Sequence, residues 1–160
     1  RSLDLSVQDF ADFELWKELT PTQLITDSTT FALLSQIGVA TSNSPAGPFK
    51  AEEKPITGSY SIDPAVFEDT DGSYYMYFGG IWGGQLQRWV TGKYDTTVGQ
   101  EPETGVALTP KIAKLSDDML SFAEDVKDVQ ILDQDGDPLL AADHDRRFFE
   151  AAWVHKHNGK

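Results

Sequence analysis

The sequence predicts an all-β fold, and three observations support this prediction. Short apolar and aromatic runs with an alternating pattern recur along the chain, and turns rich in Gly, Pro and Asp separate them. Helical periodicity is weak, because residues 6–19 match a helical spacing only loosely. Short strands between such turns are typical of a β-sandwich, barrel or propeller. A chain of 160 residues is long enough for one domain with a core, and too short for two.

Strands are expected wherever β-branched and aromatic residues cluster between turn signals. In chain order these segments are 37–42, 64–68, 73–78, 111–115, 129–132 and 148–156. The runs on either side of Asp69-Thr70-Asp71-Gly72 predict a hairpin over residues 62–79, because Asp-Gly is a strong hairpin signal. Asn158-Gly159 is another such signal, so a second hairpin is expected to begin at Phe148.

The remaining segments are expected to be irregular. Residues 43–49 contain two prolines and a glycine and predict a loop after the first strand. Residues 91–110 are polar and lack periodicity, which predicts a long surface insertion. Residues 117–122 are expected to form a turn and not a helix.

The composition describes an acidic, ordered protein. Hydrophobic residues make up 39% and aromatic residues 11% of the chain, and the formal net charge is −13. The charge argues against nucleic acid or an anionic membrane as a partner, because both bind clustered Lys and Arg. No cysteine is present, which excludes disulfides and Cys-based metal sites or nucleophiles. No apolar run approaches the ~18 residues of a membrane span, and the first residues do not resemble a signal peptide.

Two carboxylates stand in settings that indicate chemistry. Asp63 lies between Ile62 and Pro64, and Glu150 lies between Phe149 and two alanines. Each is expected to be desolvated by its apolar neighbours, which for Glu150 are Phe148, Phe149 and Trp153, and desolvation favours the protonated form. Pro64 is expected to hold Asp63 in extended backbone. Two acids in separate environments are what acid-assisted hydrolysis of a glycosidic bond requires. Ordinary acids at strand ends are the alternative for either residue taken alone.

Four stretches follow one another in a recognisable order: residues 37–49, 61–72 running into 77–80, 114–121 and 148–160. Together they resemble glycoside hydrolase family 43, the five-bladed β-propeller β-xylosidases and α-L-arabinofuranosidases. The likeness covers residues 37–160, whereas residues 1–36 match the family poorly. It implies that residues 1–160 are a fragment of a single β-propeller catalytic domain. About half the propeller would be covered, because five four-stranded blades need well over ~200 residues.

The resemblance also implies catalytic roles. Glu150 corresponds to the general acid of an inverting mechanism, and Asp63 to a third carboxylate that orients the acid and modulates its pKa. The general base is not found in this chain, because none of the candidates has the setting of the family motif: Asp4, Asp9, Asp12 and Asp27. The 160-residue piece alone is therefore expected to be inactive.

Substrate-binding residues are expected beside these acids. Trp82, Gln85 and Arg88 lie in a glycine-rich loop, and aromatic rings with amide or guanidinium donors suit a sugar ring. Ile62 and Phe149, which flank the two acids, are assigned to the same role. Alternatively, Trp82 and Trp89 pack on the core, as tryptophans commonly do.

No metal site is predicted. Asp133, Asp135, Gly136 and Asp137 invite a calcium interpretation, but the glycine comes too early for an EF-hand loop, so a surface turn is favoured. The three histidines, His144, His155 and His157, do not have the spacing of a metal triplet. No cofactor is expected. Some family members hold a structural cation on the propeller axis, and nothing in this sequence assigns its ligands.

The function implied by the resemblance is removal of terminal xylose or arabinose from plant cell-wall polysaccharide or oligosaccharide by inverting acid–base hydrolysis. A xylo- or arabino-oligosaccharide is then the expected partner. Three alternatives stay open: a non-catalytic carbohydrate-binding propeller, an inactive fragment without its base, and a related retaining enzyme acting on fructosides. The sequence determines neither the oligomeric state nor the compartment, whether cytoplasmic, periplasmic or extracellular.

Overall fold

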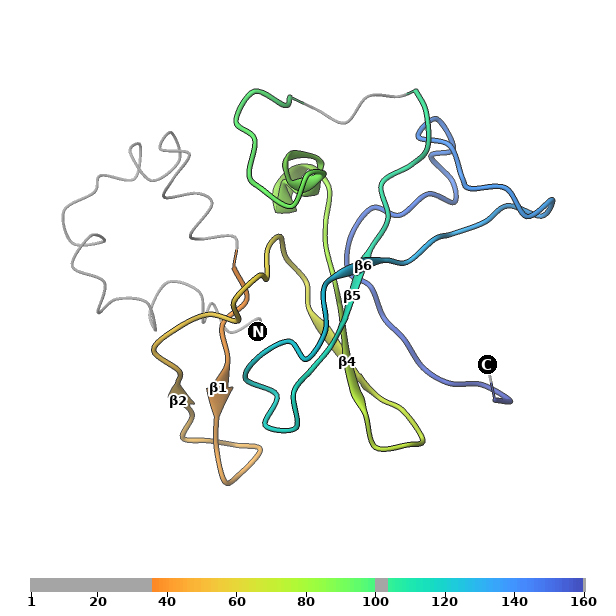
Figure 1. Cartoon of the computed structure of the whole chain (residues 1–160). Coiled ribbons are helices and arrows are strands. Elements are labelled where there is room, and N and C mark those ends of the chain that lie inside the picture. Colours follow the sequence, from red (N-terminus) through yellow and green to blue (C-terminus); the bar gives the residue numbers. More distant parts are fainter. Residues whose placement is uncertain (1–35, 100–103, 160) are drawn as a thin grey trace.

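The computed structural model describes residues 36–99 and 104–159, and across them the chain consists of β-strands, turns and extended segments (Figure 1). Within these ranges there is no α-helix, and the helical content is limited to two 3-10 turns, η1 (Trp82–Gly84) and η2 (Leu86–Trp89). The all-β prediction is therefore confirmed. The loosely helical segment 6–19 lies outside the described residues. In the part described, no helix is long and apolar enough to cross a membrane.

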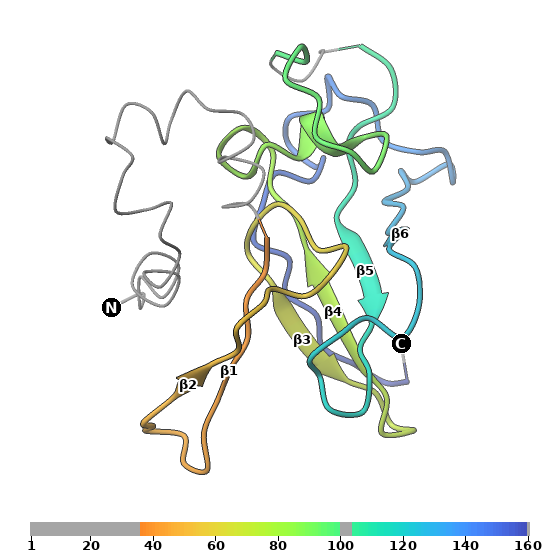
Figure 2. The ribbon, with the colours of Figure 1, turned by 60° about the vertical axis from the view of Figure 1, so that its left-hand side comes forward.

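A four-stranded antiparallel sheet forms the centre of the described structure. Its strands lie in chain order, so that each pairs with its neighbour in sequence: β3 (Ala65–Glu68), β4 (Tyr74–Phe78), β5 (Lys111–Lys114) and β6 (Lys127–Asp128). Figure 2 shows β3, β4 and β5 side by side, and β3 is one of the two edge strands of the sheet. A four-stranded meander is the unit of a propeller blade. The described residues form one such sheet and not a closed propeller.

The predicted hairpin over residues 62–79 is confirmed as β3 and β4. Phe67 pairs with Tyr75 and Glu68 with Tyr74 across the ladder. The turn is closed by two backbone hydrogen bonds, from the Asp69 N–H to the Ser73 carbonyl (2.8 Å) and from the Gly72 N–H to the Asp69 carbonyl (2.9 Å). Gly72 has a φ of 81°, a conformation that glycine adopts without steric cost. The Asp-Gly signal was therefore sufficient to place this turn.

The core lies on one face of the sheet, because alternate residues of β4 point to it. Met76 and Phe78 are 2% and 0% exposed. The Phe78 ring meets Tyr60 edge-on at 5.5 Å between centroids and stacks on Phe122 at 6.0 Å. Burying a phenylalanine fully stabilises the fold by about 1.5–3 kcal/mol. Burial also raises the pKa of Tyr60 to about 12, and the nearby Asp128 carboxylate adds to this shift, so Tyr60 is a neutral core residue.

The first predicted strand, 37–42, is wrong in length. Only β1 (Ala40–Thr41) is a strand, and it pairs with β2 (Lys50–Ala51) on the far side of the predicted 43–49 loop. The backbone of Ile37 is instead satisfied by the Ser59 hydroxyl, which accepts from its N–H at 2.9 Å, and by the N–H of Ile56, which donates to its carbonyl at 2.8 Å. These partners replace a strand ladder, so the segment is extended but not a strand.

The strand predicted at 129–132 is also wrong. β6 comes earlier, at Lys127–Asp128, and the pairing with β5 ends there. The Val129 N–H still donates to the Pro110 carbonyl at 2.9 Å, but Pro110 has no N–H to return a bond, so the ladder stops. Leu132 forms only an isolated bridge with Pro138.

The second predicted hairpin, from residue 148, is not present. Residues 148–156 form no strand, and among the described residues they make one isolated bridge, from Glu150 to Gly80, beyond the end of β4. The Asn158-Gly159 turn does form. A strand requires a continuous ladder, and beyond Glu150 the described chain supplies no partner for one.

The irregular segments agree in part with the predictions made from the sequence. Residues 117–122 form the expected turn, in which the Met119 N–H donates to the Ser116 carbonyl at 2.8 Å. The insertion predicted over 91–110 is too long, because Ala107 and Pro110 are buried. The Ala107 N–H donates to the Leu139 carbonyl at 2.8 Å, and this contact returns the chain to the core before residue 110.

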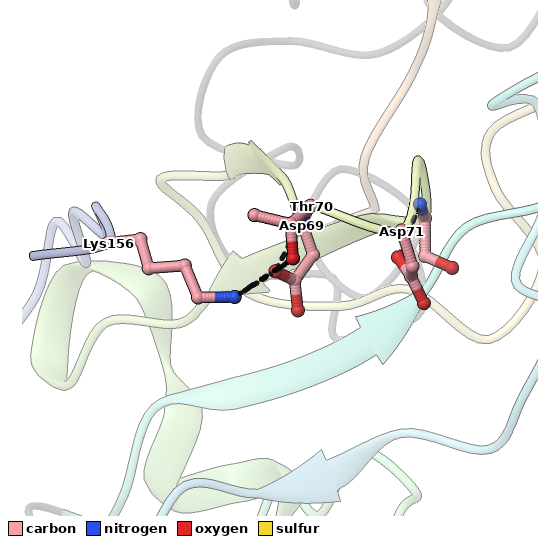
Figure 3. A network of polar contacts seen from close by, with 5 residues as sticks. Asp69, Thr70, Asp71 and Lys156 are labelled. Atoms are coloured by element: carbon pink, nitrogen blue, oxygen red, sulfur yellow. Dashed lines mark hydrogen bonds and ion pairs between the residues drawn. The ribbon is translucent and has the colours of Figure 1, made fainter. Parts of the chain in front are cut away.

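An ion pair joins the extended C-terminal segment to the turn of the β3–β4 hairpin. Lys156 Nζ lies 2.5 Å from Asp69 Oδ1 and also donates to the Thr70 hydroxyl, as Figure 3 shows. The two partners are 87 residues apart in sequence, so this contact is tertiary. The hydrogen bond from Lys156, with that from the Thr70 N–H, holds the pKa of Asp69 below its ordinary value of 3.8.

Replacing Lys156 with Met is expected to make the stability of the full-length protein less sensitive to acid. A depressed carboxylate pKa contributes stability above the ordinary value, and that contribution is lost as the pH falls through the lowered pKa. Thermal midpoints of wild type and Lys156→Met should therefore differ near neutrality and converge below the ordinary value of 3.8. Lys54→Met, at an exposed loop lysine, is the charge-matched control. A difference that persists unchanged in acid would contradict this account.

Candidate active site

Three consecutive residues, Gly79, Gly80 and Ile81, hold the backbones of both candidate acids. The Gly79 N–H donates to the carbonyl of Ile62, the residue before Asp63, at 2.8 Å. Gly80 forms an antiparallel bridge with Glu150. The Ile81 N–H donates to the carbonyl of Phe149, the residue before Glu150, at 2.9 Å. The segment that follows β4 therefore brings together two motifs that are almost ninety residues apart in sequence.

The Ile62 side chain fills the space that the glycines leave. A Cβ atom at Gly80 would lie 2.8 Å from Ile62 Cγ1 and 3.2 Å from Glu150 Cβ, and one at Gly84 would lie 2.6 Å from Ile62 Cγ1. Contacts below 3.0 Å do not occur without a shift of the surroundings. Both positions therefore require glycine for packing. The close approach that Gly80 and Gly84 permit is made by the Ile62 side chain.

Left-handed backbone is concentrated around the same place. Five non-glycine residues near the two acids have φ between 56° and 67°: Ser61, Asp63, Trp82, Gln85 and Ala151. Each such residue costs of order ~1–3 kcal/mol, and this strain tends to gather at functional sites. Asp63 itself has a φ of 57°, so the expectation that Pro64 holds it extended is wrong. Aspartate is among the residues that tolerate this conformation best.

Both candidate acids are exposed in the described structure. Asp63 lines an open groove of about 460 Å³ between residues 63–67 and residues 151–154. Of the three aromatic residues expected to desolvate Glu150, Phe149 and Trp153 are exposed, by 42% and 84%, whereas Phe148 packs against the core. The described residues therefore do not supply the apolar enclosure that the sequence predicts for Glu150.

An aromatic pair, Trp82 and Phe149, comes from the two segments that the hydrogen bond between Ile81 and Phe149 joins. Trp82 and Phe149 meet edge to face, with ring centroids 5.2 Å apart, and Trp82 is 47% exposed. The Gln85 side chain donates to the Trp82 carbonyl and so belongs to the same loop structure. The Trp82 ring offers apolar surface together with an N–H donor, and Phe149 adds further apolar surface, which suits a ligand with both apolar and polar groups.

Arg88 and Trp89 lie in a different environment. The Trp89 ring stacks on Tyr60 at 5.0 Å, in agreement with the interpretation that this tryptophan packs on the core. Arg88 donates to the Tyr94 hydroxyl at 3.0 Å, and its guanidinium carbon lies 5.7 Å from the centre of that ring. The structure thus groups Ile62, Trp82, Gln85 and Phe149 near the acids, whereas Arg88 contacts Tyr94.

Residues 133–137 form a turn that the Asp133 carboxylate organises. Its Oδ1 accepts from the N–H groups of Asp135 (2.9 Å) and Asp137 (3.0 Å), and these bonds lower the pKa of Asp133. Within residues 36–99 and 104–159, no three His, Asp or Glu side chains gather closely enough to hold a metal ion.

Sequence reasoning missed one functional candidate, Ser61. This residue is buried, and its hydroxyl contacts both backbone polar groups of Gly80. A buried serine two residues before a candidate catalytic acid carries no distinctive sequence pattern. The only available signal was its place directly before Ile62-Asp63-Pro64.

Two exposed carboxylates and two partly exposed aromatic rings thus lie in the segments beside the end of the blade-like meander, and paired carboxylates of this kind are what glycoside hydrolases use. Comparison with known proteins agrees: the model of glycosyl hydrolases family 43 matches residues 22–160, which include all four motifs. The chain therefore belongs to glycoside hydrolase family 43.

Several relatives are closely similar to this chain. It is 58% identical over 132 residues to xylosidase/arabinosidase 43A of Humicola insolens and 56% identical over 126 residues to a xylosidase/arabinosidase of Bacteroides ovatus. These matches cover 78% of this chain, but only 40% and 38% of the relatives. The chain thus spans about two fifths of the length of these curated relatives.

Solved structures of family 43 enzymes are also closely similar to this chain. A β-xylosidase/α-arabinofuranosidase from a compost microbial metagenome, in complex with xylotriose, is 65% identical with a TM-score of 0.75. A family 43 enzyme of Xanthomonas citri, also complexed with xylotriose, is 53% identical with a TM-score of 0.74. Both matches cover 78% of this chain, and 39% and 38% of those chains.

Proposed function

We propose that this chain is part of an inverting, exo-acting glycosidase that removes terminal xylose or arabinose from plant cell-wall oligosaccharides or polysaccharides. In this proposal the complete protein is a five-bladed β-propeller, and the β3–β6 sheet is one of its blades. The observation that carries the proposal is the joint anchoring of Asp63 and Glu150 on residues 79–81. Family membership and the xylotriose complexes of two similar enzymes support the substrate class.

Glu150 is the general acid in this proposal. It protonates the departing glycosidic oxygen while water attacks the anomeric carbon from the opposite face of the sugar ring. Asp63 is the third carboxylate, which orients Glu150. The base that activates water is not found in this chain. Trp82 and Phe149 form one wall of the sugar site, with Ile62 and Gln85 behind them.

The full-length protein is expected to hydrolyse nitrophenyl β-xyloside, nitrophenyl α-arabinofuranoside or both, and to release the sugar with inverted configuration. Inversion follows because water attacks directly and no covalent intermediate forms. A panel of nitrophenyl glycosides that includes a fructoside measures the preference, and NMR of the first-formed anomer measures the stereochemistry. Binding of xylotriose without turnover would indicate a carbohydrate-binding propeller instead. A product of retained configuration would contradict the mechanism.

A further inference from the structure

The hydroxyl of Ser61 holds both backbone polar groups of Gly80. Ser61 Oγ accepts from the Gly80 N–H at 3.0 Å and donates to the Gly80 carbonyl at 3.3 Å. A serine hydroxyl has one proton and two acceptor sites, so it can make both bonds at once. Ser61 is only 3% exposed, and its φ is 67°, so the chain keeps a buried serine in a conformation that disfavours it.

Gly80 in turn is the residue that contacts Glu150. The two form an antiparallel bridge, and a Cβ built on Gly80 would lie only 3.2 Å from Glu150 Cβ. The next residue, Ile81, binds the carbonyl of Phe149 through its N–H at 2.9 Å. A shift of the Gly80 backbone would therefore move the base of the Glu150 side chain with it.

The same serine belongs to the motif that carries Asp63. Ile62 separates the two residues, its carbonyl accepts from the Gly79 N–H, and its side chain lies against Gly80 and Gly84. One buried hydroxyl thus links the backbone of the Asp63 motif to the backbone that supports Glu150. Within the part of the chain that the structure describes, no other side chain forms a hydrogen bond with Gly80.

We infer that Ser61 is a positioning residue for the proposed reaction, and that its two hydrogen bonds to Gly80 set where the Glu150 carboxyl group meets the glycosidic oxygen. This inference rests on the proposed function. Proton transfer requires the acid within hydrogen-bond reach of the leaving oxygen. A misplacement of about 1 Å can cost ~10²-fold in rate, even when the altered residue does not touch the substrate.

Two variants of the full-length protein separate the hydroxyl from the strained backbone. Ser61→Ala removes the hydroxyl and keeps the strain of a left-handed residue, whereas Ser61→Gly removes both. If the hydroxyl matters, both variants should show the same kinetic defect. The matched control is Ser59→Ala, because Ser59 is also buried (2% exposed) and its hydroxyl also holds backbone, accepting from the Ile37 N–H and donating to the Ile56 carbonyl.

The readout is kcat on xylobiose compared with kcat on nitrophenyl β-xyloside. Xylobiose has a poor leaving group that needs protonation, and nitrophenolate departs with little help. Both Ser61 variants are expected to lose ~10–10²-fold on xylobiose and much less on the nitrophenyl substrate. Ser59→Ala should leave the ratio of the two rates at the wild-type value, whatever it does to the thermal midpoint.

An unchanged ratio in Ser61→Ala and Ser61→Gly would overturn the inference and leave the proposed function intact. Recovery of the wild-type ratio in Ser61→Gly alone would overturn it too, because the defect would then come from backbone strain. Failure of the wild-type protein to hydrolyse either substrate would overturn the proposed function, and with it this inference.

Discussion

Glu150→Gln in the full-length protein is expected to reduce hydrolysis of xylobiose by ~10²–10⁴-fold, the usual contribution of a positioned general acid. Glutamine keeps the size and hydrogen-bonding capacity of the side chain but has no transferable proton. The loss on nitrophenyl β-xyloside should be much smaller, because its leaving group departs without protonation. The measurement is the ratio of the two losses in kcat, with xylobiose and nitrophenyl β-xyloside assayed under the same conditions.

Two further variants make this ratio interpretable. Glu68→Gln, at the exposed end of β3, is the matched control and should leave both rates near wild type. Asp63→Asn should slow both substrates and change the pH dependence of kcat, because it removes a charge near the acid and not the proton donor itself. Equal losses on both substrates in Glu150→Gln would show that Glu150 is not the general acid.

The parts of the fold that the sequence predicted correctly depend on local signals. The β3–β4 hairpin follows from an Asp-Gly turn between aromatic runs, and turn residues act through their own backbone conformations. β5 lies within the segment predicted at 111–115, between Pro110 and the turn at 117–122. The strand predicted at 129–132 is absent because Pro110, nineteen positions before the segment begins, has no N–H with which to continue the ladder. The strand predicted at 148–156 is absent because a strand needs a partner strand, and the composition of a segment does not show whether it has one.

The candidate site, like the fold, could be predicted only in part from the sequence. Glu150 and Asp63 could be chosen from their motifs, but their exposure depends on which elements surround them, and single-sequence reasoning does not show that. Phe149 and Trp153 looked like an apolar enclosure in sequence, yet both rings face outward. Ser61 and the glycines at 80 and 84 contact residues that are distant in sequence, so only the structure reveals these contacts.

Gly84→Ala is expected to destabilise the full-length protein by about 1–3 kcal/mol, the usual cost of forcing extra volume into packed structure. Its Cβ would lie 2.6 Å from Ile62 Cγ1 and 2.8 Å from Ser61 Oγ. Neither atom is the far end of a flexible side chain, so the neighbours cannot move away cheaply. Gly83→Ala is the matched control one residue earlier, because a Cβ there meets nothing within 4 Å. Denaturant unfolding of both variants measures the difference.

The source of the clash can be tested with Ile62→Ala, which removes the Cγ1 and Cδ1 atoms that crowd Gly84. In the double variant, Gly84→Ala should cost less than it does alone, because the new methyl group then occupies the vacated space. Residues in contact typically show coupling energies of ~0.5–3 kcal/mol in such a cycle. Additive losses in the double variant, or equal stability of Gly84→Ala and Gly83→Ala, would show that Ile62 does not pack on Gly84. Because the same side chain also crowds Gly80, beside Glu150, such a result would remove the packing support proposed for the acid.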